Sequence, residues 1–250
     1  MNGANSRFKA EHLDVFAGIP FRVQGELGKS PAQWVAELGI DGVPEAKSLP
    51  QHALDRRQVR AICQDTLKPV LFGYICAMAW GYQEQGPRGY SGATKPWQNR
   101  NTIRTNLEKL RAGNFTRREA YNLFAVEARV GGLGPSYFTK LLYFFSPSID
   151  FWIMDQWTAK SINLLTGVTV VRMSGSAPCS RNKGGNYQAY CEEVDELARL
   201  LGVCGDEVEQ RLMSKGKPDP WPWRVHVVQH CDYNSQLVRS RYPHIPKKQL

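Results

Sequence analysis

The sequence predicts a mostly α-helical fold. Apolar residues recur at helical spacing in several segments, Ser, Asp and Thr stand where such segments begin, and Gly stands where they end. The one clearly β-prone run is short and lies within residues 168–186. Hydrophobic residues make up 42% and aromatic residues 11% of the 250 residues, which excludes a disordered chain and leaves room for a sizeable core.

Helices are expected through most of the first half of the chain. Ser30 and Pro31 begin an amphipathic helix that runs to Leu38, and Gly39 is suited to its C-cap. Residues 50–67 predict a second, charged helix. Residues 70–82 are almost wholly apolar and indicate a buried helix, with a buried strand as the alternative. Residues 83–98 are rich in Gly and Pro and predict a loop.

The second half continues in the same way. Residues 101–112, 187–201 and 206–213 have the periodicity of amphipathic helices, and Gly202 separates the last two. The β-prone run in 168–186 is followed by a loop rich in Gly, Ser, Lys and Arg. From Lys217 onward, Pro and Trp indicate an extended, basic tail over residues 217–250.

The charge of the chain favours a polyanionic partner. Lys and Arg number 32 against 23 Asp and Glu, a net charge of +9, and nucleic acid is the first partner to expect. An acidic protein surface or membrane headgroups remain as alternatives. No apolar stretch approaches the roughly 18 residues of a membrane span, and the first residues, MNGANSRFKAEH, contain no apolar signal region. A cytoplasmic protein is expected.

The cysteines and histidines do not indicate a metal centre. The six cysteines form no CxxC pair, so we expect free thiols that pack as small hydrophobic groups. His226 and His230, followed by Cys231, could form half of a metal site, but no further motif completes it. Neither a metal nor another cofactor is therefore expected.

Residues 114–166 contain the most informative pattern. Thr116 to Glu119 forms a capping box that begins a helix, and Gly131-Gly132-Leu133-Gly134 ends it. Pro135 suits the first turn of the next helix. The short connection predicts two antiparallel helices, with backbone amides exposed at the positive end of the second helix, where a phosphate can bind. The alternative is that the glycines serve only to turn the chain.

Asp155 is the carboxylate that this pattern singles out. It follows the apolar run of residues 151–154 and precedes a helical pattern, so it is placed at a helix N-cap. Asp is a favoured N-cap residue for structural reasons alone. The alternative to a catalytic role is therefore that Asp155 only caps the helix. Its position, about twenty residues beyond the glycine hairpin, favours a second role near the phosphate-binding turn.

The stretch VGGLGPSYFTKLLYFFSPSIDFWIMDQW resembles the helix-hairpin-helix DNA glycosylase superfamily, particularly its 8-oxoguanine DNA glycosylase-like branch. The resemblance covers residues 114–166. It implies that Gly132, Leu133 and Gly134 form the DNA-binding hairpin and that Asp155 is the catalytic carboxylate. It also implies a mostly α, two-lobed helical fold, with the active-site cleft between the lobes, and a single glycosylase unit over residues 1–250.

This chain departs from the family pattern at two positions. Phe138 stands where the family commonly has a small residue at the crossing of the two hairpin helices, so their packing is expected to differ. Bifunctional members carry a nucleophilic lysine two residues after the second hairpin glycine, where this chain has Ser136. Lys140 lies one helical turn further on, and Lys140 and Ser136 are secondary candidates for the active site. The departure at Ser136 favours a monofunctional enzyme without lyase activity, which uses water and leaves an intact abasic site.

A base pocket and a DNA-binding surface complete the expected site. A flipped base needs aromatic and polar contacts, and the Gly-rich segment around residues 80–90 offers them. The pocket candidates are Trp80, Tyr82, Gln83, Arg88 and Tyr90. The alternative is that Trp80 and Tyr82 close a core and that Arg88 faces solvent.

The basic residues near the hairpin predict a DNA-binding surface. Residues 88–118 contain eight Lys and Arg and one acidic residue, so Arg100, Arg117 and Arg118 are expected to contact DNA. The alternative is that these residues form an ordinary charged face exposed to solvent.

Two substrate classes and one rival function remain open. The resemblance favours an oxidised purine such as 8-oxoguanine, whereas the missing lysine and the Gly-rich turn favour a bulky modified pyrimidine of phage DNA, which would make this an antiviral defence enzyme. The partner is double-stranded DNA with a modified base, bound by a monomer that would associate with the nucleoid in a bacterium. The rival is a non-catalytic helix-hairpin-helix DNA-binding module.

Overall fold

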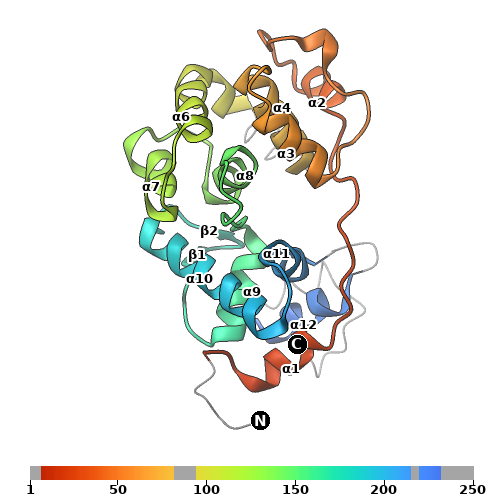
Figure 1. The fold of residues 1–250 in the computed structure, drawn as a ribbon, viewed down its shortest axis with the longest axis vertical. Coiled ribbons are helices and arrows are strands. Elements are labelled where there is room, and N and C mark those ends of the chain that lie inside the picture. The colour runs from red at the N-terminus through yellow and green to blue at the C-terminus, as the bar shows by residue number, and fades with distance from the viewer. Residues whose placement is uncertain (1–6, 82–93, 215–219, 232–250) are drawn as a thin grey trace.

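The computed structural model describes residues 7–81, 94–214 and 220–231 and confirms a mostly helical protein. In Figure 1, α2, α3, α4, α6 and α8 lie in the upper part of the molecule, and α1, α9, α10, α11 and α12 lie in the lower part. The division into two lobes with an active-site cleft between them remains a prediction. The α-helices of the described residues are α1 (Ala10–Ala17), α2 (Pro31–Leu38), α3 (Arg56–Gln64), α4 (Val70–Gly81), α6 (Arg100–Ala112), α7 (Arg117–Asn122), α8 (Pro135–Phe145), α9 (Gln156–Thr166), α10 (Gly184–Leu201), α11 (Gly205–Met213) and α12 (Pro222–His230).

Shorter elements connect these helices. A 3₁₀ turn, η1, covers Ala46–Ser48, and a π-helical segment, η2 (Leu123–Glu127), directly extends α7. The strands β1 (Met173–Ser174) and β2 (Ala177–Pro178) form a two-stranded antiparallel sheet. No described helix combines the length and the apolar character needed to cross a membrane.

Local capping residues explain where several helices begin and end. The Ser30 hydroxyl accepts a hydrogen bond from the Gln33 amide at the start of α2, and Gly39 ends that helix in the left-handed conformation. Asp55 forms a capping box with Gln58, so α3 begins at Arg56 rather than near residue 50. The apolar stretch from Val70 is a buried helix, not a strand.

The structure corrects three local predictions. Residues 94–98 are helical rather than a loop, because Trp97 is buried and its indole N–H donates to the Asp41 carbonyl oxygen at 2.8 Å. The helix that begins after Thr116 changes to π-helical geometry at Leu123. Within the predicted extended tail, residues 222–230 form α12, because Pro222 starts the helix and Trp223 and Val227 bury against the core.

A buried extended segment, Phe151 to Met154, connects α8 to α9 and carries the chain to Asp155. Hydroxyl groups from α10 and α8 bind its backbone. Tyr187 donates to the Trp152 carbonyl oxygen at 2.8 Å, Tyr190 donates to that of Ile153 at 2.7 Å, and Thr139 accepts from the Met154 amide at 3.1 Å. These bonds hold the start of α9 in one place relative to α8 and α10.

Candidate active site

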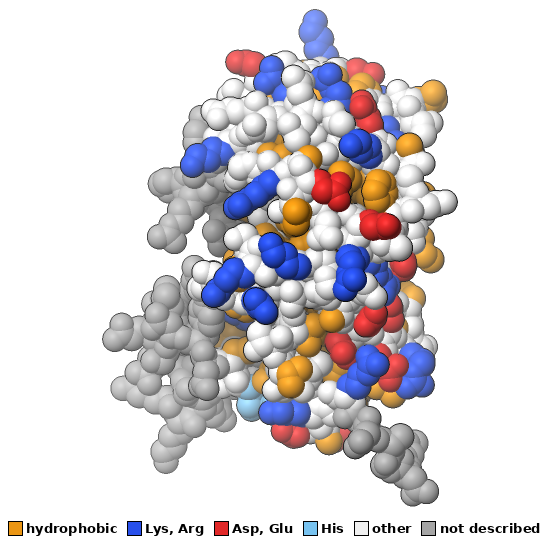
Figure 2. Space-filling view, turned by 90° about the vertical axis from the view of Figure 1, so that its left-hand side faces the viewer, with side chains coloured by type: hydrophobic (Ala, Val, Ile, Leu, Met, Phe, Trp, Pro, Cys, Tyr) orange, Lys and Arg blue, Asp and Glu red, His pale blue; other side chains and the backbone are white. Residues whose placement is uncertain are grey.

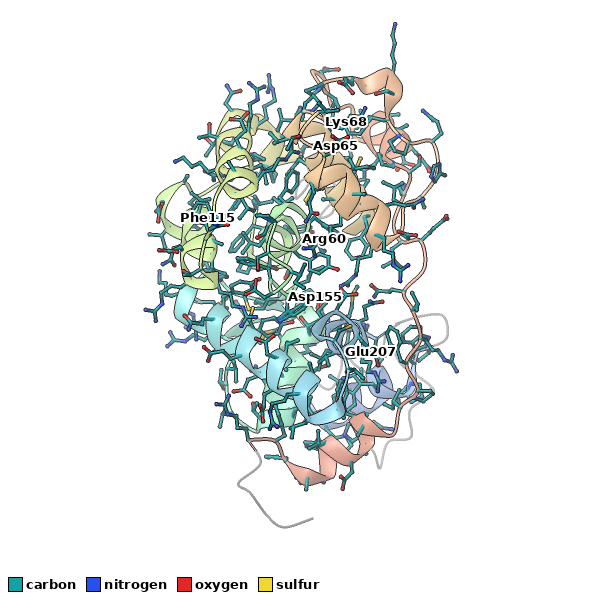
Figure 3. All side chains as sticks on the ribbon, viewed as in Figure 1. Arg60, Asp65, Lys68, Phe115, Asp155 and Glu207 are labelled. Atoms are coloured by element: carbon teal, nitrogen blue, oxygen red, sulfur yellow. The ribbon has the colours of Figure 1, made fainter. Side chains whose placement is uncertain are left out.

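Asp155 is the N-cap residue of α9, as the sequence predicts. Its Oδ1 atom accepts hydrogen bonds from the backbone amides of Trp157 at 2.7 Å and Thr158 at 2.9 Å. The Thr158 hydroxyl in turn accepts from the Asp155 amide at 2.9 Å, which completes a capping box. Both cap bonds use Oδ1, so Oδ2 is not engaged by the cap. The side chain lies near the centre of the molecule, between α8 and the helices α9 and α11 (Figure 3).

Lys140 of α8 lies within range of the charge of this carboxylate. The residue is only 7% exposed, and its ammonium lies over the Tyr137 ring, 5.3 Å from the ring centroid. A Cβ atom at Gly81, the last residue of α4, would lie 2.8 Å from Lys140 Nζ, so a side chain there would displace the end of the lysine. Burial lowers the pKa of Lys140, and the negative charges of Asp155 and Glu209 oppose that shift. Ser136, one turn earlier, has a buried hydroxyl with no hydrogen-bond partner among the described residues.

Arg56 of α3 joins this region to α11. Its guanidinium binds the carboxylates of Glu209 and, at 3.0 Å, Asp206, and it donates to Gln24 Oε1 at 3.2 Å. The Tyr143 hydroxyl donates to the same Asp206 oxygen at 2.5 Å. Burial raises the pKa of the Glu209 carboxyl to about 7, although the charge of Arg56 acts in the opposite direction. Neither Arg56 nor Glu209 was predicted as a site residue, because the sequence indicated only an amphipathic helix over residues 206–213.

The glycine hairpin lies between η2 and α8. Leu133 is buried, and its amide donates to the Val130 carbonyl oxygen at 3.2 Å. Gly132 has a φ of +84° and its α-carbon faces Lys95 and Pro96, so a side chain there would be both strained and crowded. Gly134 is the N-cap of α8, and a Cβ atom at Gly134 would meet nothing within 4 Å. Pro135 has no N–H, and the Tyr137 and Phe138 amides donate to the Gly134 carbonyl oxygen, so the amide of Ser136 is the one next to Gly134 that suits an anion.

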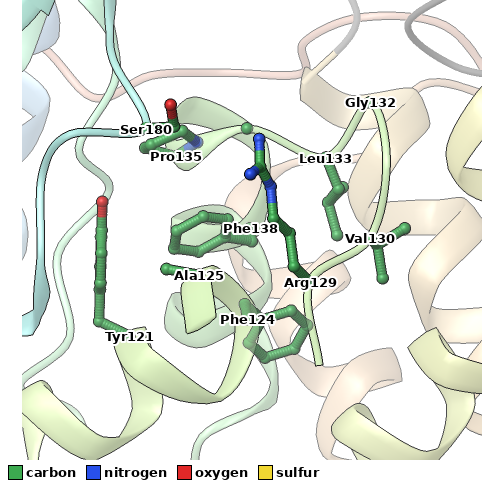
Figure 4. A pocket seen from close by; sticks show the side chains of 11 residues that line it. Tyr121, Phe124, Ala125, Arg129, Val130, Gly132, Leu133, Pro135, Phe138 and Ser180 are labelled. Carbon is green, nitrogen blue, oxygen red and sulfur yellow. The ribbon is translucent and has the colours of Figure 1, made fainter. Parts of the chain in front are cut away.

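A cavity of about 260 Å³ lies behind this hairpin (Figure 4). Phe138 fills the space between the two hairpin helices, since its ring packs on Tyr121 at 4.8 Å and stacks on Phe124 at 5.9 Å between centroids. Arg129 extends along the cavity, and Ser180 approaches from the segment after β2. The packing at Phe138 is therefore made by aromatic rings of α7, η2 and α8.

The three arginines that were expected to contact DNA have different surroundings in the structure. The Arg117 guanidinium is mostly buried and binds Asp195 at 2.6 Å and the Asp150 carbonyl oxygen at 2.9 Å, and its contact with DNA stays a prediction. Arg118 and Arg100 are exposed, and Arg100 lies over the Trp97 ring. Figure 2 shows Lys and Arg side chains spread over this face, with most of the Asp and Glu side chains in its right-hand half.

Of the predicted base-pocket residues, only Trp80 lies in the described part of the chain. It is 1% exposed and packs edge-to-face on Phe144, so the core alternative is correct for this residue as the structure has it. Its indole N–H has no hydrogen-bond partner among the described residues. Tyr82, Gln83, Arg88 and Tyr90 lie outside the described residues.

The histidines form a cluster that joins the two ends of the described chain. His12 Nδ1 of α1 lies 3.1 Å from His226 Nε2 of α12, and the rings of His226 and His230 lie 4.1 Å apart. Burial lowers the pKa of His226 to about 4. In residues 7–81, 94–214 and 220–231, no group of three or more His, Cys, Asp or Glu is arranged to hold a metal ion.

The described residues thus form a helical fold with a carboxylate at a helix cap, a buried lysine and a glycine turn before α8. Residues 23–213 match the family model described as putative 8-oxoguanine DNA glycosylase OGG-like protein, and the chain belongs to this OGG-like family. Family membership indicates a DNA glycosylase whose substrate is DNA. No curated protein and no solved structure matches the chain.

Proposed function

We propose that this protein is a monofunctional DNA glycosylase, which flips a modified base out of duplex DNA, hydrolyses its N-glycosidic bond and leaves an abasic site. The observation that carries the proposal is the geometry of Asp155. Its Oδ1 is held by the backbone amides of Trp157 and Thr158 in the first turn of α9. The carboxylate is therefore preorganised in a largely buried position.

This geometry suits the chemistry of glycosidic bond cleavage. As the bond between C1′ and the base breaks, positive charge builds up on the sugar ring, and a preorganised carboxylate stabilises that charge. Asp155 can also accept a proton from the water that attacks C1′. The base leaves with the bonding electron pair. Both roles need an ionised carboxylate that is held in position, which the α9 cap supplies.

A second candidate is a bifunctional enzyme that uses Lys140 as the nucleophile. It is favoured by the burial of Lys140 within range of the charge of Asp155 and by the lowered pKa of its ammonium, since a neutral amine attacks C1′. Ser136, at the position of the family lysine, argues for the monofunctional enzyme because a hydroxyl cannot form a Schiff base.

Borohydride trapping distinguishes these two enzymes. With the wild-type chain and a duplex that contains the modified base or an abasic site, we expect no covalent protein–DNA adduct, and we expect strand cleavage only after alkali is added. A trapped adduct that disappears in Lys140→Ala would show that the nucleophile lies one turn further along α8. Absence of alkali-dependent cleavage on every substrate would favour the non-catalytic DNA-binding module.

The hairpin is expected to bind a DNA phosphate. Gly134→Val adds a side chain where the fold leaves open space, so it should preserve stability and weaken DNA binding regardless of sequence, because the side chain would block the approach to the Ser136 amide. Gly25→Val is the matched control, since that exposed glycine also has nothing within 4 Å of an added Cβ. Titrations followed by fluorescence anisotropy should show a log–log salt slope of about −0.9 per neutralised phosphate. Equal binding by the two variants, or binding that does not change with salt, would contradict this role.

The base that the enzyme releases is proposed to be either an oxidised purine such as 8-oxoguanine or a bulky modified pyrimidine of phage DNA. Family membership supports the purine, and Ser136 in place of the family lysine supports the pyrimidine and with it a role in antiviral defence. Mass spectrometry of the bases released from normal, oxidised and phage-derived genomic DNA would identify the substrate.

A further inference from the structure

Helix α12 lies beyond the residues that match the family model, yet it packs on the helix that Asp155 caps. The match covers residues 23–213, whereas α12 covers Pro222–His230. In the lower part of the molecule, α12 contacts α9 and α11 (Figure 1). Two neighbouring side chains of α12, Trp223 and Arg224, contribute to these contacts, and both are buried. Family membership assigns no role to this helix.

Arg224 joins the first turn of α9 to the end of α11. Its guanidinium lies 3.7 Å from the centre of the Trp157 ring, close enough for the cation to be attracted to the face of the ring. The same guanidinium donates to the carbonyl oxygens of Met213 and Ser214, where α11 ends. Ser214 has a φ of +46°, which is strained for a residue with a side chain. The bonds from Arg224 therefore also stabilise a costly backbone conformation.

Trp157 connects Arg224 to the carboxylate of Asp155. The backbone amide of Trp157 donates to Asp155 Oδ1 at 2.7 Å, the shorter of the two cap bonds. Its half-buried indole ring also lies 4.5 Å from Nζ of Lys160, one turn further along α9. Because the ring and the amide belong to the same residue, contacts that fix the ring also restrict the position of the amide.

Trp223 holds α9 at a second point. Its indole N–H donates to the Ser161 hydroxyl at 2.9 Å, and that hydroxyl donates to the Leu212 carbonyl oxygen at 2.9 Å. Residues 157 and 161 are four positions apart and so lie on the same face of α9. Two successive residues of α12 thus connect this face of α9 to the C-terminal turn of α11.

We propose that Arg224 is a positioning residue for base release: through the ring of Trp157 it holds the first turn of α9, and with it the Asp155 carboxylate, in the orientation that glycosidic bond cleavage needs. This inference rests on the proposed function. Asp155 keeps the chemical roles described above, and Arg224 acts on them only through Trp157. A carboxylate that is free to shift loses part of its effect on the transition state, because its stabilising charge is no longer preorganised.

The test is a double-mutant cycle on single-turnover base release, at saturating enzyme and at a temperature where each variant is folded. Arg224→Met should lower the rate constant about tenfold without changing the Kd for DNA. Trp157→Leu removes the ring but keeps the amide that binds Asp155, and it should lower the rate constant by a similar factor. The double variant should be no slower than Arg224→Met alone, because both substitutions break the same contact. Trp157→Phe keeps an aromatic face for Arg224 and should be faster than Trp157→Leu.

Arg211→Met is the matched control for a role in stability alone. The Arg211 guanidinium also binds a backbone carbonyl oxygen, that of Ile19 at 3.0 Å, and also lies over an aromatic ring, that of Phe21. These contacts join α11 to residues 19–21 rather than to α9. Arg211→Met should lower the midpoint of thermal unfolding, as Arg224→Met does, but leave the rate constant of the folded molecules unchanged. Loss of stability alone reduces the fraction of active enzyme and not this rate constant.

Hydrogen exchange measured by nuclear magnetic resonance gives a readout that needs no substrate. The amides of Trp157 and Thr158 should exchange about tenfold faster in Arg224→Met and at the wild-type rate in Arg211→Met. Wild-type exchange and excision in Arg224→Met, or losses of rate that add in the double variant, would overturn the inference. If Arg224→Met does not fold, equal excision by Trp157→Leu and the wild type would overturn it. If the wild type releases no base, the proposed function fails, and the exchange of the two amides still decides whether Arg224 fixes the cap of α9.

Discussion

Replacing Asp155 by Asn is expected to slow base release by about 10²-fold or more while the fold and DNA binding persist. The substitution removes the negative charge that stabilises the sugar cation and the group that accepts the proton of water. The Asn side-chain oxygen can still accept from the amides of Trp157 and Thr158, so the cap of α9 remains, and the free energy of unfolding should change by less than about 1 kcal/mol. DNA binding should be equal or tighter, because one repulsion with the phosphates disappears.

Single-turnover base release and thermal unfolding should be measured on the same protein preparation. Asp55→Asn is the matched control, because Asp55 is also an N-cap with a complete capping box, at the start of α3. This variant should excise at the wild-type rate. If Asp155→Asn also excises at the wild-type rate, Asp155 is only a helix cap, and the assignment of the active site is wrong.

The second large effect is expected for Arg56→Met, which should lower the free energy of unfolding by about 3–5 kcal/mol. The guanidinium is almost fully buried and is the ionic partner of Glu209, whose carboxylate has no exposed surface. Without it, a buried negative charge remains unpaired next to the charge of Asp155. Methionine preserves most of the apolar packing against the rings of Tyr143 and Trp80.

Urea and thermal unfolding at pH 8 would measure this cost, because Glu209, with a pKa of about 7, is ionised at that pH. For a chain of this size the midpoint should fall by about 10 °C. Arg57→Met, on the next and exposed residue of α3, should change stability by no more than about 0.5 kcal/mol. A cost for Arg56→Met as small as that of Arg57→Met would mean that the Arg56–Glu209 pair contributes no net stability.

Local sequence was sufficient for several features of the fold and site. Ser30, Pro31 and Gly39 bound α2 as predicted, and Thr116 begins α7 with its capping box. Asp155 caps α9 as predicted. These features depend on hydrogen bonds between residues at most a few positions apart, so the residue types and their spacing carry the information. The glycine hairpin belongs to the same category, because the φ of +84° at Gly132 is a local requirement that glycine meets.

Other features depend on contacts between distant parts of the chain. Arg117 is predicted to contact DNA because its neighbours in sequence are basic, and its pairing with Asp195 of α10 is visible only in the structure. Trp80 looked like a pocket residue, yet its ring faces Phe144 of α8 in the core. Residues 222–230 looked extended, yet α12 buries Trp223 beside Phe16 of α1. In each case tertiary packing decided the outcome.

By itself, the sequence determined the helical fold class, the glycine turn and the position of Asp155 at a helix N-cap. Helical periodicity, turns and caps depend on interactions between residues that are close together in the sequence. Only the tertiary structure decided which charges surround that carboxylate. Arg56 and Glu209 are separated by 153 positions along the chain, and their charges act on Lys140 of a third helix. Their ionisation depends on burial and on each other's charge, and neither can be obtained from the spacing of residues along the chain.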